Sequence, residues 1–287
     1  MIERISSKAE VRWAVAEARR ENKRVGFVPT MGALHEGHLS LVRAACARTD
    51  VVVVSVFVNP TQFGPGEDFE AYPRSVESDI EMLGAEGIEL VFTPSPEEMY
   101  DAGHQVDVEP GPLARRWEGT VRPGHFGGVA TVVTKLLGIV RPDLAFFGDK
   151  DYQQLKIIQR LVLDLDLGVG VVACPTIREP DGLAMSSRNA YLTPEQRSAA
   201  LGIPEALEAS AKALAWGERD TAELELAMRQ AAEQRGGGAI SLDYAAVVDP
   251  DTLEPLARVE REARAIIAGR LGATRLIDNC ALIPPLA

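Results

Sequence analysis

The segment Val25–Val42, with the sequence VGFVPTMGALHEGHLSLV, combines an apolar strand, a tight turn and the start of a helix. The strand pattern covers residues 25–28, the turn is Pro-Thr-Met-Gly, and the helix is predicted to open around His35-Glu36-Gly37-His38. The turn glycine allows a ligand to approach the backbone, and free N–H groups at a helix start favour an anion such as phosphate. The segment therefore predicts a phosphate-binding turn. A capped turn that carries two surface histidines is the alternative.

Helix and strand patterns alternate on both sides of this segment, up to about residue 175. This order predicts a parallel sheet with crossover helices, a Rossmann-like doubly wound α/β fold, with ligand sites at the carboxyl ends of the strands. The predicted helices cover residues 8–21, 37–48, 75–86, 129–140 and 152–165, and the predicted strands cover 25–28, 51–58, 88–92, 144–147 and 169–173.

The pattern changes after Cys174-Pro175. Two Ala/Glu/Arg-rich helical stretches, separated at Trp216-Gly217, are followed by a glycine break at 236–238 and by strand patterns near 242–248, 263–268 and 274–278. We therefore expect two domains, residues 1–175 with the Rossmann-like fold and residues 176–287 with a smaller α+β fold.

Composition excludes some partners. The formal net charge is −12 and the pI is about 4.9, so the protein repels polyanions such as tRNA or an anionic membrane face, and an anionic substrate must find local cations. Cys46, Cys174 and Cys280 lie far apart in the sequence, which fits a reducing cytoplasm. We expect no export and no membrane span, since the longest apolar run, Val51–Val58, is far shorter than the ~20 residues a helix needs.

Polar residues follow the second long strand. Asn59 and Gln62, in the segment VNPTQFG, offer amides that can orient hydroxyl and carboxylate groups. A turn that only satisfies its own backbone is the alternative. Asp79 lies on the next predicted helix, where a solvated carboxylate is expected.

Two later segments also carry polar groups. In FFGDKDYQQ, residues 146–154, Lys150 is a candidate cation for phosphate oxygens, Asp151 can hold a ribose hydroxyl or cap the helix, and Gln154 can hold substrate. In Ile177–Arg188, the hydroxyls and guanidinium of Met-Ser-Ser-Arg can wrap a triphosphate. An ordinary capped helix and an ordinary polar loop are the respective alternatives.

Two sequence patterns contain histidines in glycine-bearing segments. The pair His35 and His38 is three residues apart and includes Gly37, whereas a zinc-protease helix needs histidines four apart, so zinc is disfavoured. The glycine-rich loop Arg122–Gly128 adds a cation and a third imidazole, that of His125.

Taken in this order, five strings resemble the pantothenate synthetase family of pantoate–β-alanine ligases, within the HxGH nucleotidyltransferase superfamily. They are PTMGALHEGH (29–38), VNPTQF (58–63), RPGHFGGV (122–129), FGDKDYQQ (147–154) and AMSSRN (184–189). The resemblance covers nearly all of the first predicted domain and the start of the second. It implies ATP-dependent condensation of (R)-pantoate with β-alanine to give pantothenate, AMP and pyrophosphate through a pantoyl-adenylate intermediate.

The resemblance also implies cofactors, partners and site residues. It implies Mg²⁺, a homodimer and a cytoplasmic location. It also implies a first domain that binds nucleotide and pantoate, and a second domain that covers the active site. His38 would be the proton donor, His35 a phosphate contact, Gln62 a contact to both pantoate and β-alanine, and Gln154 a second contact to pantoate. Lys150 and Arg188 complete the candidate catalytic set. The implied ATP-binding residues are Met31, Gly32, Ala33, Leu34, His35, Glu36, Gly37, His38, Gly148, Asp149, Lys150, Asp151, Ile177, Met185, Ser186, Ser187 and Arg188.

The chain departs from the family at two positions, since Asp149 stands where Glu is frequent and Gly127 where a larger polar residue is common. Arg188 is the only cation in the segment that corresponds to the Lys-Met-Ser-Lys-Ser loop of tRNA synthetases, which disfavours that class. Another HxGH nucleotidyltransferase acting on a small carboxylate or phosphate, and a nucleotide-binding regulatory protein without turnover, remain the alternatives.

Overall fold

The computed structural model describes residues 2–285, which form two compact units. The first comprises the chain up to Asp149 together with Gln153–Pro175, and the second comprises Lys150–Tyr152 together with the chain from Thr176 onward. The segment Lys150–Tyr152 thus groups with the second unit, although its neighbours in sequence belong to the first.

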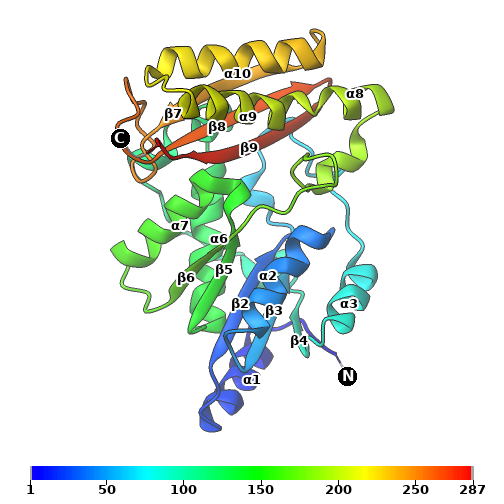
Figure 1. Ribbon diagram of the computed structural model, residues 1–287. Helices are drawn as coiled ribbons and strands as arrows, with labels where there is room; N and C mark the ends of the chain where they lie inside the picture. Colours follow the sequence, from blue (N-terminus) through cyan, green and yellow to red (C-terminus); the bar gives the residue numbers. More distant parts are fainter. Residues whose placement is uncertain (1, 286–287) are drawn as a thin grey trace. The chain divides into compact units, whose positions relative to one another are not determined.

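A six-stranded parallel sheet forms the centre of the first unit (Figure 1). Its order is β1-β4-β3-β2-β5-β6. From β2 the chain adds β3 and β4 on one side and then β5 and β6 on the other side, and β1 pairs with β4 at the edge. The carboxyl ends of β2 and β5 therefore flank the point where the strand order reverses, which is where doubly wound sheets bind ligands. The strands are β1 (Glu3–Ile5), β2 (Val25–Thr30), β3 (Val51–Val56), β4 (Leu90–Phe92), β5 (Leu144–Gly148) and β6 (Gly170–Cys174).

Helices cover both faces of this sheet, which is why its strands are apolar at successive positions. Val25 and Phe27 of β2 pack into one hydrophobic cluster and Val28 into another, and Phe147 and Phe146 of β5 divide in the same way. The first cluster includes residues of α1 (Lys8–Arg20), α6 (His125–Val140) and α7 (Tyr152–Asp164), and the second includes residues of α2 (Glu36–Cys46) and α3 (Val76–Ala85). Shorter helical turns are η1 (Pro60–Gln62), α4 (Pro96–Met99), η2 (Pro112–Ala114), α5 (Glu118–Val121) and η3 (Asp149–Asp151).

The second unit contains a three-stranded antiparallel sheet in the order β7-β8-β9. Helices α9 and α10 lie along one face of this sheet (Figure 1) and share an apolar core with it. The strands are β7 (Ser241–Val248), β8 (Ala263–Leu271) and β9 (Thr274–Leu282), and the helical elements are η4 (Ser187–Tyr191), α8 (Pro194–Ala199), α9 (Gly202–Ala215) and α10 (Thr221–Gly236).

The predicted fold class, a Rossmann-like parallel sheet with a smaller α+β part, is confirmed. Strand β1 was not predicted, because only Ile5 of its three residues is buried and the segment shows no periodic pattern. Helix α6 begins at His125, earlier than predicted, since Gly124 supplies the left-handed residue before its first turn.

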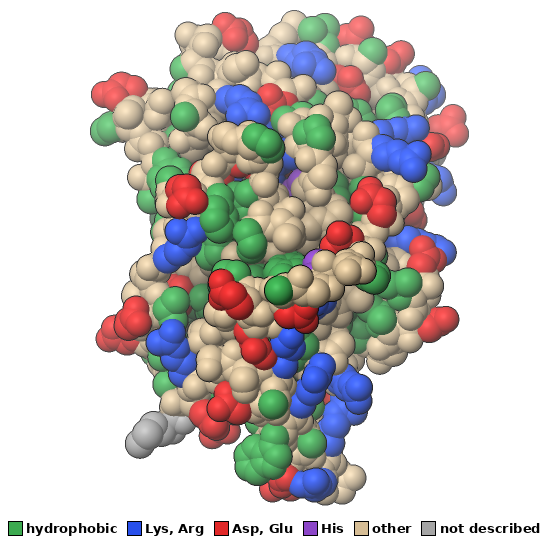
Figure 2. All heavy atoms as spheres, turned by 180° about the vertical axis from the view of Figure 1, so that it is seen from behind, with side chains coloured by type: hydrophobic (Ala, Val, Ile, Leu, Met, Phe, Trp, Pro, Cys, Tyr) green, Lys and Arg blue, Asp and Glu red, His purple; other side chains and the backbone are tan. Residues whose placement is uncertain are grey.

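The surface is mixed in charge despite the acidic total. On the face drawn in Figure 2, Lys and Arg side chains lie among Asp and Glu side chains. Between residues 2 and 285, no helix has both the length and the apolarity needed to cross a membrane.

Candidate active site

The turn between β2 and α2 is held by a buried carboxylate on α3. Gly32 and Ala33 both have positive φ, +82° and +52°, a conformation that side chains rarely adopt. The two Asp79 oxygens accept the amides of Ala33 (3.0 Å) and Leu34 (2.8 Å), and Asp79 is only 1% exposed. Burial raises the pKa of the Asp79 carboxyl, and the two amide hydrogen bonds oppose this shift. The expectation of a solvated Asp79 is therefore wrong, because this turn needs an acceptor for two inward-facing amides.

His35 and His38 form a paired cap at the start of α2. His35 Nδ1 accepts the Gly37 amide (3.1 Å), and the His35 amide donates to His38 Nδ1 in a longer contact of 3.4 Å. The two ring centroids are 4.1 Å apart. Because both Nδ1 atoms act as acceptors, a neutral form of either ring carries its proton on Nε2. The local fold thus selects the tautomer in which Nε2–H is the donor.

Several backbone amides of this segment already have acceptors. The amides of Ala33 and Leu34 donate to Asp79, that of Gly37 to His35, and that of His38 to the His35 carbonyl (2.8 Å). The prediction of free N–H groups at this helix start is wrong for these amides. Anion binding here would depend on the imidazoles more than on the backbone.

A buried amide network at the end of β3 holds Gln62. Asn59 Nδ2 donates to Gln62 Oε1 (3.2 Å) and to the Gly128 carbonyl (3.2 Å), while Asn59 Oδ1 accepts the Tyr100 hydroxyl (2.8 Å). Gln62 Nε2 lies 3.0 Å from the Met31 sulfur, so the structure brings Met31 and Gln62 together. Asn59 and Gln62 are 1% and 7% exposed. This is more than a turn that satisfies its own backbone, because the partners come from three separate parts of the chain.

His125 fixes the backbone of Gln62. Its Nδ1 lies 2.8 Å from the Gln62 carbonyl and its Nε2 lies 3.0 Å from Arg122, which can only donate. His125 therefore has its proton on Nδ1. Arg122 also forms a two-point ion pair with Glu67 (both 2.7 Å). Burial, assisted by the nearby Arg122 charge, lowers the pKa of His125 from 6.5 to about 4, so the ring is neutral near pH 7.

These contacts give a structural role to Arg122 and His125, the cation and the imidazole that the sequence indicated in the segment Arg122–Gly128. The sequence indicated both groups, but it did not indicate Glu67, which lies 55 positions from Arg122. Both side chains position Gln62.

Gly128 allows α6 to approach η1. A Cβ atom placed on Gly128 would lie 2.5 Å from the Thr61 carbonyl oxygen and 2.7 Å from the Gln62 Cα. Any larger residue would push away the turn that carries Gln62. By contrast, a Cβ on Gly138 of the same helix would meet no atom within 4 Å.

Adjacent glutamines on α7 have different environments. Gln153 is buried, accepts the Glu118 amide (3.0 Å) and donates to the Leu113 and Arg116 carbonyls (2.7 and 2.9 Å), which makes it a structural residue. Gln154, the predicted pantoate contact, is partly exposed one position later. Gly148 and Asp149 end β5 and begin η3 in the same unit.

The other predicted site residues lie in the second unit. The Met185 amide donates to the Ile177 carbonyl (2.9 Å), so the structure brings Ile177 beside the segment Met185–Arg188. Ser186 caps η4 by accepting the Arg188 amide (3.3 Å). Lys150 and Asp151 belong to this unit as well.

Within residues 2–285, no group of three or more His, Cys, Asp or Glu side chains is arranged to hold a metal ion. A nucleotide-bound Mg²⁺ needs fewer protein ligands, because phosphates and waters supply most of its coordination.

Comparison with known proteins gives one consistent result. A family model described as Pantoate-beta-alanine ligase matches residues 3–281. Curated relatives include the pantothenate synthetase of Rubrobacter xylanophilus, 53% identical over 286 residues (97% of this chain and 98% of that protein), and that of Thermotoga neapolitana, 50% identical over 266 residues (93% and 94%).

Solved structures agree with these relatives. The pantothenate synthetase from Thermus thermophilus superposes with a TM-score of 0.93 at 48% identity, covering 99% of this chain and 100% of that one. The pantoate-β-alanine ligase of Francisella tularensis, whose crystal structure is described as complexed with β-γ ATP and β-alanine, superposes with a TM-score of 0.80 at 34% identity, covering 98% and 97%.

Proposed function

Since the chain belongs to the pantoate–β-alanine ligase family and is therefore an enzyme that joins pantoate to β-alanine, we propose that it activates pantoate with ATP as a pantoyl adenylate. The pantoate carboxylate attacks the α-phosphorus of ATP and pyrophosphate leaves. The β-alanine amine then attacks the carbonyl carbon of the adenylate, loses a proton and expels AMP. The products are pantothenate, AMP and pyrophosphate.

The observation that carries this proposal is the imidazole pair at the start of α2. Both Nδ1 atoms accept backbone amides, so each neutral ring presents a proton on Nε2. We assign His35 to a phosphate contact and His38 to proton donation as charge develops on the phosphate oxygens. The Asp79 carboxylate holds the turn before α2 and thereby sets the backbone position from which the His35 and His38 side chains project.

The first chemical step brings two anions together. At ~4 Å and an effective dielectric near 20, each pair of unit charges repels by about 4 kcal/mol. We propose that Lys150 and Arg188 offset this repulsion by contacting phosphate oxygens. A protein with a net charge of −12 depends on such local cations for an anionic substrate.

Gln62 and Gln154 are proposed to orient pantoate, and Gln62 also to contact β-alanine. Holding a carboxylate in line with phosphorus can supply on the order of 7 to 11 kcal/mol, provided that the holding group is rigid. The Gln62 side chain meets this condition, because Asn59 binds its Oε1 and His125 lies 2.8 Å from its backbone carbonyl.

The remaining proposed ATP contacts lie in three segments, Met31–His38, Gly148–Asp151 and Met185–Arg188, together with Ile177. The amides of Ala33 and Leu34 already donate to Asp79. Contacts of these two residues with ATP would therefore use carbonyl or apolar atoms.

Four wider properties are proposed on chemical grounds or on the resemblance. Mg²⁺ enters as part of the MgATP substrate, since phosphates and water satisfy most of its coordination. A cytoplasmic location is supported by the three cysteines, all of which are free thiols. Residues 1–175 would bind nucleotide and pantoate, residues 176–287 would cover the active site, and the enzyme would be a homodimer, as the resemblance implies.

The direct test incubates the purified enzyme with ATP, Mg²⁺ and pantoate, with and without β-alanine. Pyrophosphate, AMP and pantothenate are followed together. Steady turnover that needs both substrates, with pantoate-dependent exchange of pyrophosphate into ATP when β-alanine is omitted, supports the adenylate route. Formation of ADP, or pantothenate without AMP, would exclude it.

A further inference from the structure

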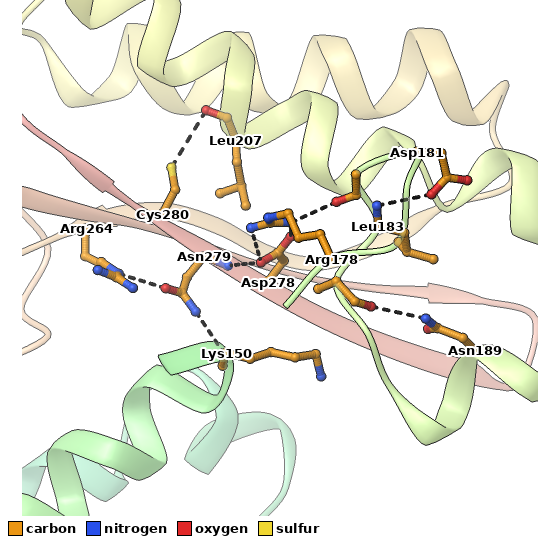
Figure 3. A network of polar contacts seen from close by, with 12 residues as sticks. Lys150, Arg178, Asp181, Leu183, Asn189, Leu207, Arg264, Asp278, Asn279 and Cys280 are labelled. Carbon is orange, nitrogen blue, oxygen red and sulfur yellow. Dashed lines mark hydrogen bonds and ion pairs between the residues drawn. The ribbon is translucent and has the colours of Figure 1, made fainter. Parts of the chain in front are cut away.

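Two adjacent polar residues are buried in β9. Asp278 and Asn279 are 3% and 4% exposed. Successive strand residues point to opposite faces, and Asp278 shares its face with Leu276 and Leu282, which pack in the core with α9 and α10. Asn279 therefore lies on the other face. A buried carboxylate and a buried amide both need partners, and Figure 3 shows Asn279 in contact with Lys150 and Arg264, and Asp278 in contact with Arg178.

Asn279 holds the backbone of Lys150. Its Nδ2 donates to the Lys150 carbonyl (2.9 Å), and its Oδ1 accepts from Arg264 Nε (2.7 Å). The Arg264 guanidinium lies 4.1 Å from the centre of the Tyr152 ring, and the Tyr152 hydroxyl donates to the Pro250 carbonyl (2.8 Å). The segment Lys150–Tyr152 is thus held at its first and last residues.

Asp278 holds the loop that leads to Arg188. Both its oxygens accept from the Arg178 guanidinium (2.6 and 3.0 Å), and Arg178 also donates to the Gly182 carbonyl (3.0 Å). The loop turns back near Gly182, so that Met185, the first residue of the Met-Ser-Ser-Arg segment, pairs with Ile177. The Asp278 side chain is 1% exposed and that of Arg178 is 33% exposed, so the carboxylate of this two-point pair is shielded from water while the arginine is partly exposed.

We propose that Asp278 and Asn279 are positioning residues for the adenylation step, Asn279 acting through Lys150 and Asp278 acting through the loop that carries Arg188. This rests on the proposal that Lys150 and Arg188 contact ATP. The two segments lie 26 or more positions apart in sequence, yet one dipeptide of β9 fixes both within the second unit. A lysine side chain has four rotatable bonds, so fixing its backbone sets the range that its ammonium group can reach.

The substitution Asn279→Asp tests the first half with little change in shape. It keeps an acceptor for Arg264 but replaces the donor to the Lys150 carbonyl with an oxygen, which repels that carbonyl. Arg275→Gln is the matched control, because Arg275 also lies on β9 but pairs with Asp243 (2.6 Å) and with neither segment through that bond. Asp278→Asn tests the second half, since it removes the charge that faces Arg178.

The readout is the dissociation constant of α,β-methylene-ATP with Mg²⁺, measured by titration calorimetry on the full-length enzyme. We expect Asn279→Asp to weaken binding about tenfold, or ~1.4 kcal/mol, and Arg275→Gln to leave it unchanged. In a Lys150→Ala background, Asn279→Asp should add little, because its effect passes through Lys150. Asp278→Asn should weaken binding by a similar factor in both backgrounds.

Each result decides a separate point. An Asn279→Asp effect of equal size with and without Lys150 would overturn the first half, and wild-type binding by Asp278→Asn would overturn the second. Wild-type binding by Lys150→Ala alone would refute the proposed role of Lys150 itself. If Asn279→Asp fails to fold, Tyr152→Phe replaces it in the same cycle, since it releases the other end of the segment by removing only the hydroxyl bonded to Pro250.

Discussion

Acidification is expected to destabilise this protein through one buried imidazole, that of His125. The ring faces Arg122 from the turn between α5 and α6, Glu67 from the loop after η1, and Glu118 from α5. Burial and the Arg122 charge lower its pKa from 6.5 to about 4, and these effects outweigh the two carboxylates. A protonated ring would also lose its acceptor for Arg122 and place a second positive charge beside it.

The size of this effect follows from the shift in pKa. Above about pH 6.5 the ring is neutral in both the folded and the unfolded chain, so it adds no pH dependence. Between pH 6.5 and about 4 the unfolded chain takes up a proton that the folded chain does not, and each unit lowers stability by ~1.4 kcal/mol. From pH 7 to pH 4.5 the loss is therefore roughly 2 to 3 kcal/mol.

The assay is urea unfolding of the wild type and of His125→Asn at several values between pH 7 and 4.5. The asparagine amide can still donate to the Gln62 carbonyl but cannot titrate. We expect its free energy of unfolding to fall by roughly 2 to 3 kcal/mol less than that of the wild type over this range, whatever its stability at pH 7.

Equal slopes for His125→Asn and the wild type would show that another group titrates and would refute the assignment. A second sign should accompany the first. Because the ring of the folded enzyme stays neutral down to about pH 4, the KM for pantoate should change by the same factor in the wild type and in His125→Asn between pH 7 and pH 5.

Three other predictions concern activity and packing. His38→Ala and Lys150→Ala should fold normally but lose most pantoate-dependent pyrophosphate exchange, and near-wild-type turnover in both would remove their assigned roles. Gly128→Ala should raise the KM for pantoate and lower stability by about 1–3 kcal/mol through overpacking against η1, whereas Gly138→Ala, in open space on the same helix, should gain ~0.5–1 kcal/mol in urea unfolding. Asp79→Ala should leave two buried amides unpaired, costing about 2 kcal/mol, and should lower kcat; unchanged kcat would show that its turn does not set the imidazoles.

The fold could be predicted because its signals are local. The β2–α2 segment combines a continuous apolar strand with a glycine turn and a helix start, and each feature depends on neighbours within a few residues. Strands β2, β3 and β5 are buried on both faces, which makes their composition distinctive. The three-residue strand β1 lacked any such signal.

The polar contacts that hold the site could not be predicted in the same way. Asp79 is 45 and 46 positions from the two amides it accepts, and its helix shows ordinary amphipathic spacing. Arg178 and Asp278 are 100 positions apart. A carboxylate on a helix or strand has the same sequence appearance whether it faces solvent or a distant arginine, so only the three-dimensional path of the chain identifies these partners.

The grouping of Lys150–Tyr152 with the second unit also limits how the protein can be dissected. A fragment that ends at Pro175 would contain every strand of the parallel sheet and would keep Lys150, but it would lack Asn279, Arg264 and Pro250. The Lys150 carbonyl and the Tyr152 hydroxyl would then have lost their partners. A truncated protein that ends at this apparent domain boundary would thus contain the parallel sheet but would leave the Lys150 backbone without its contact to Asn279. A chimera that takes its C-terminal part from a relative would need a residue at position 279 that can make the same contact.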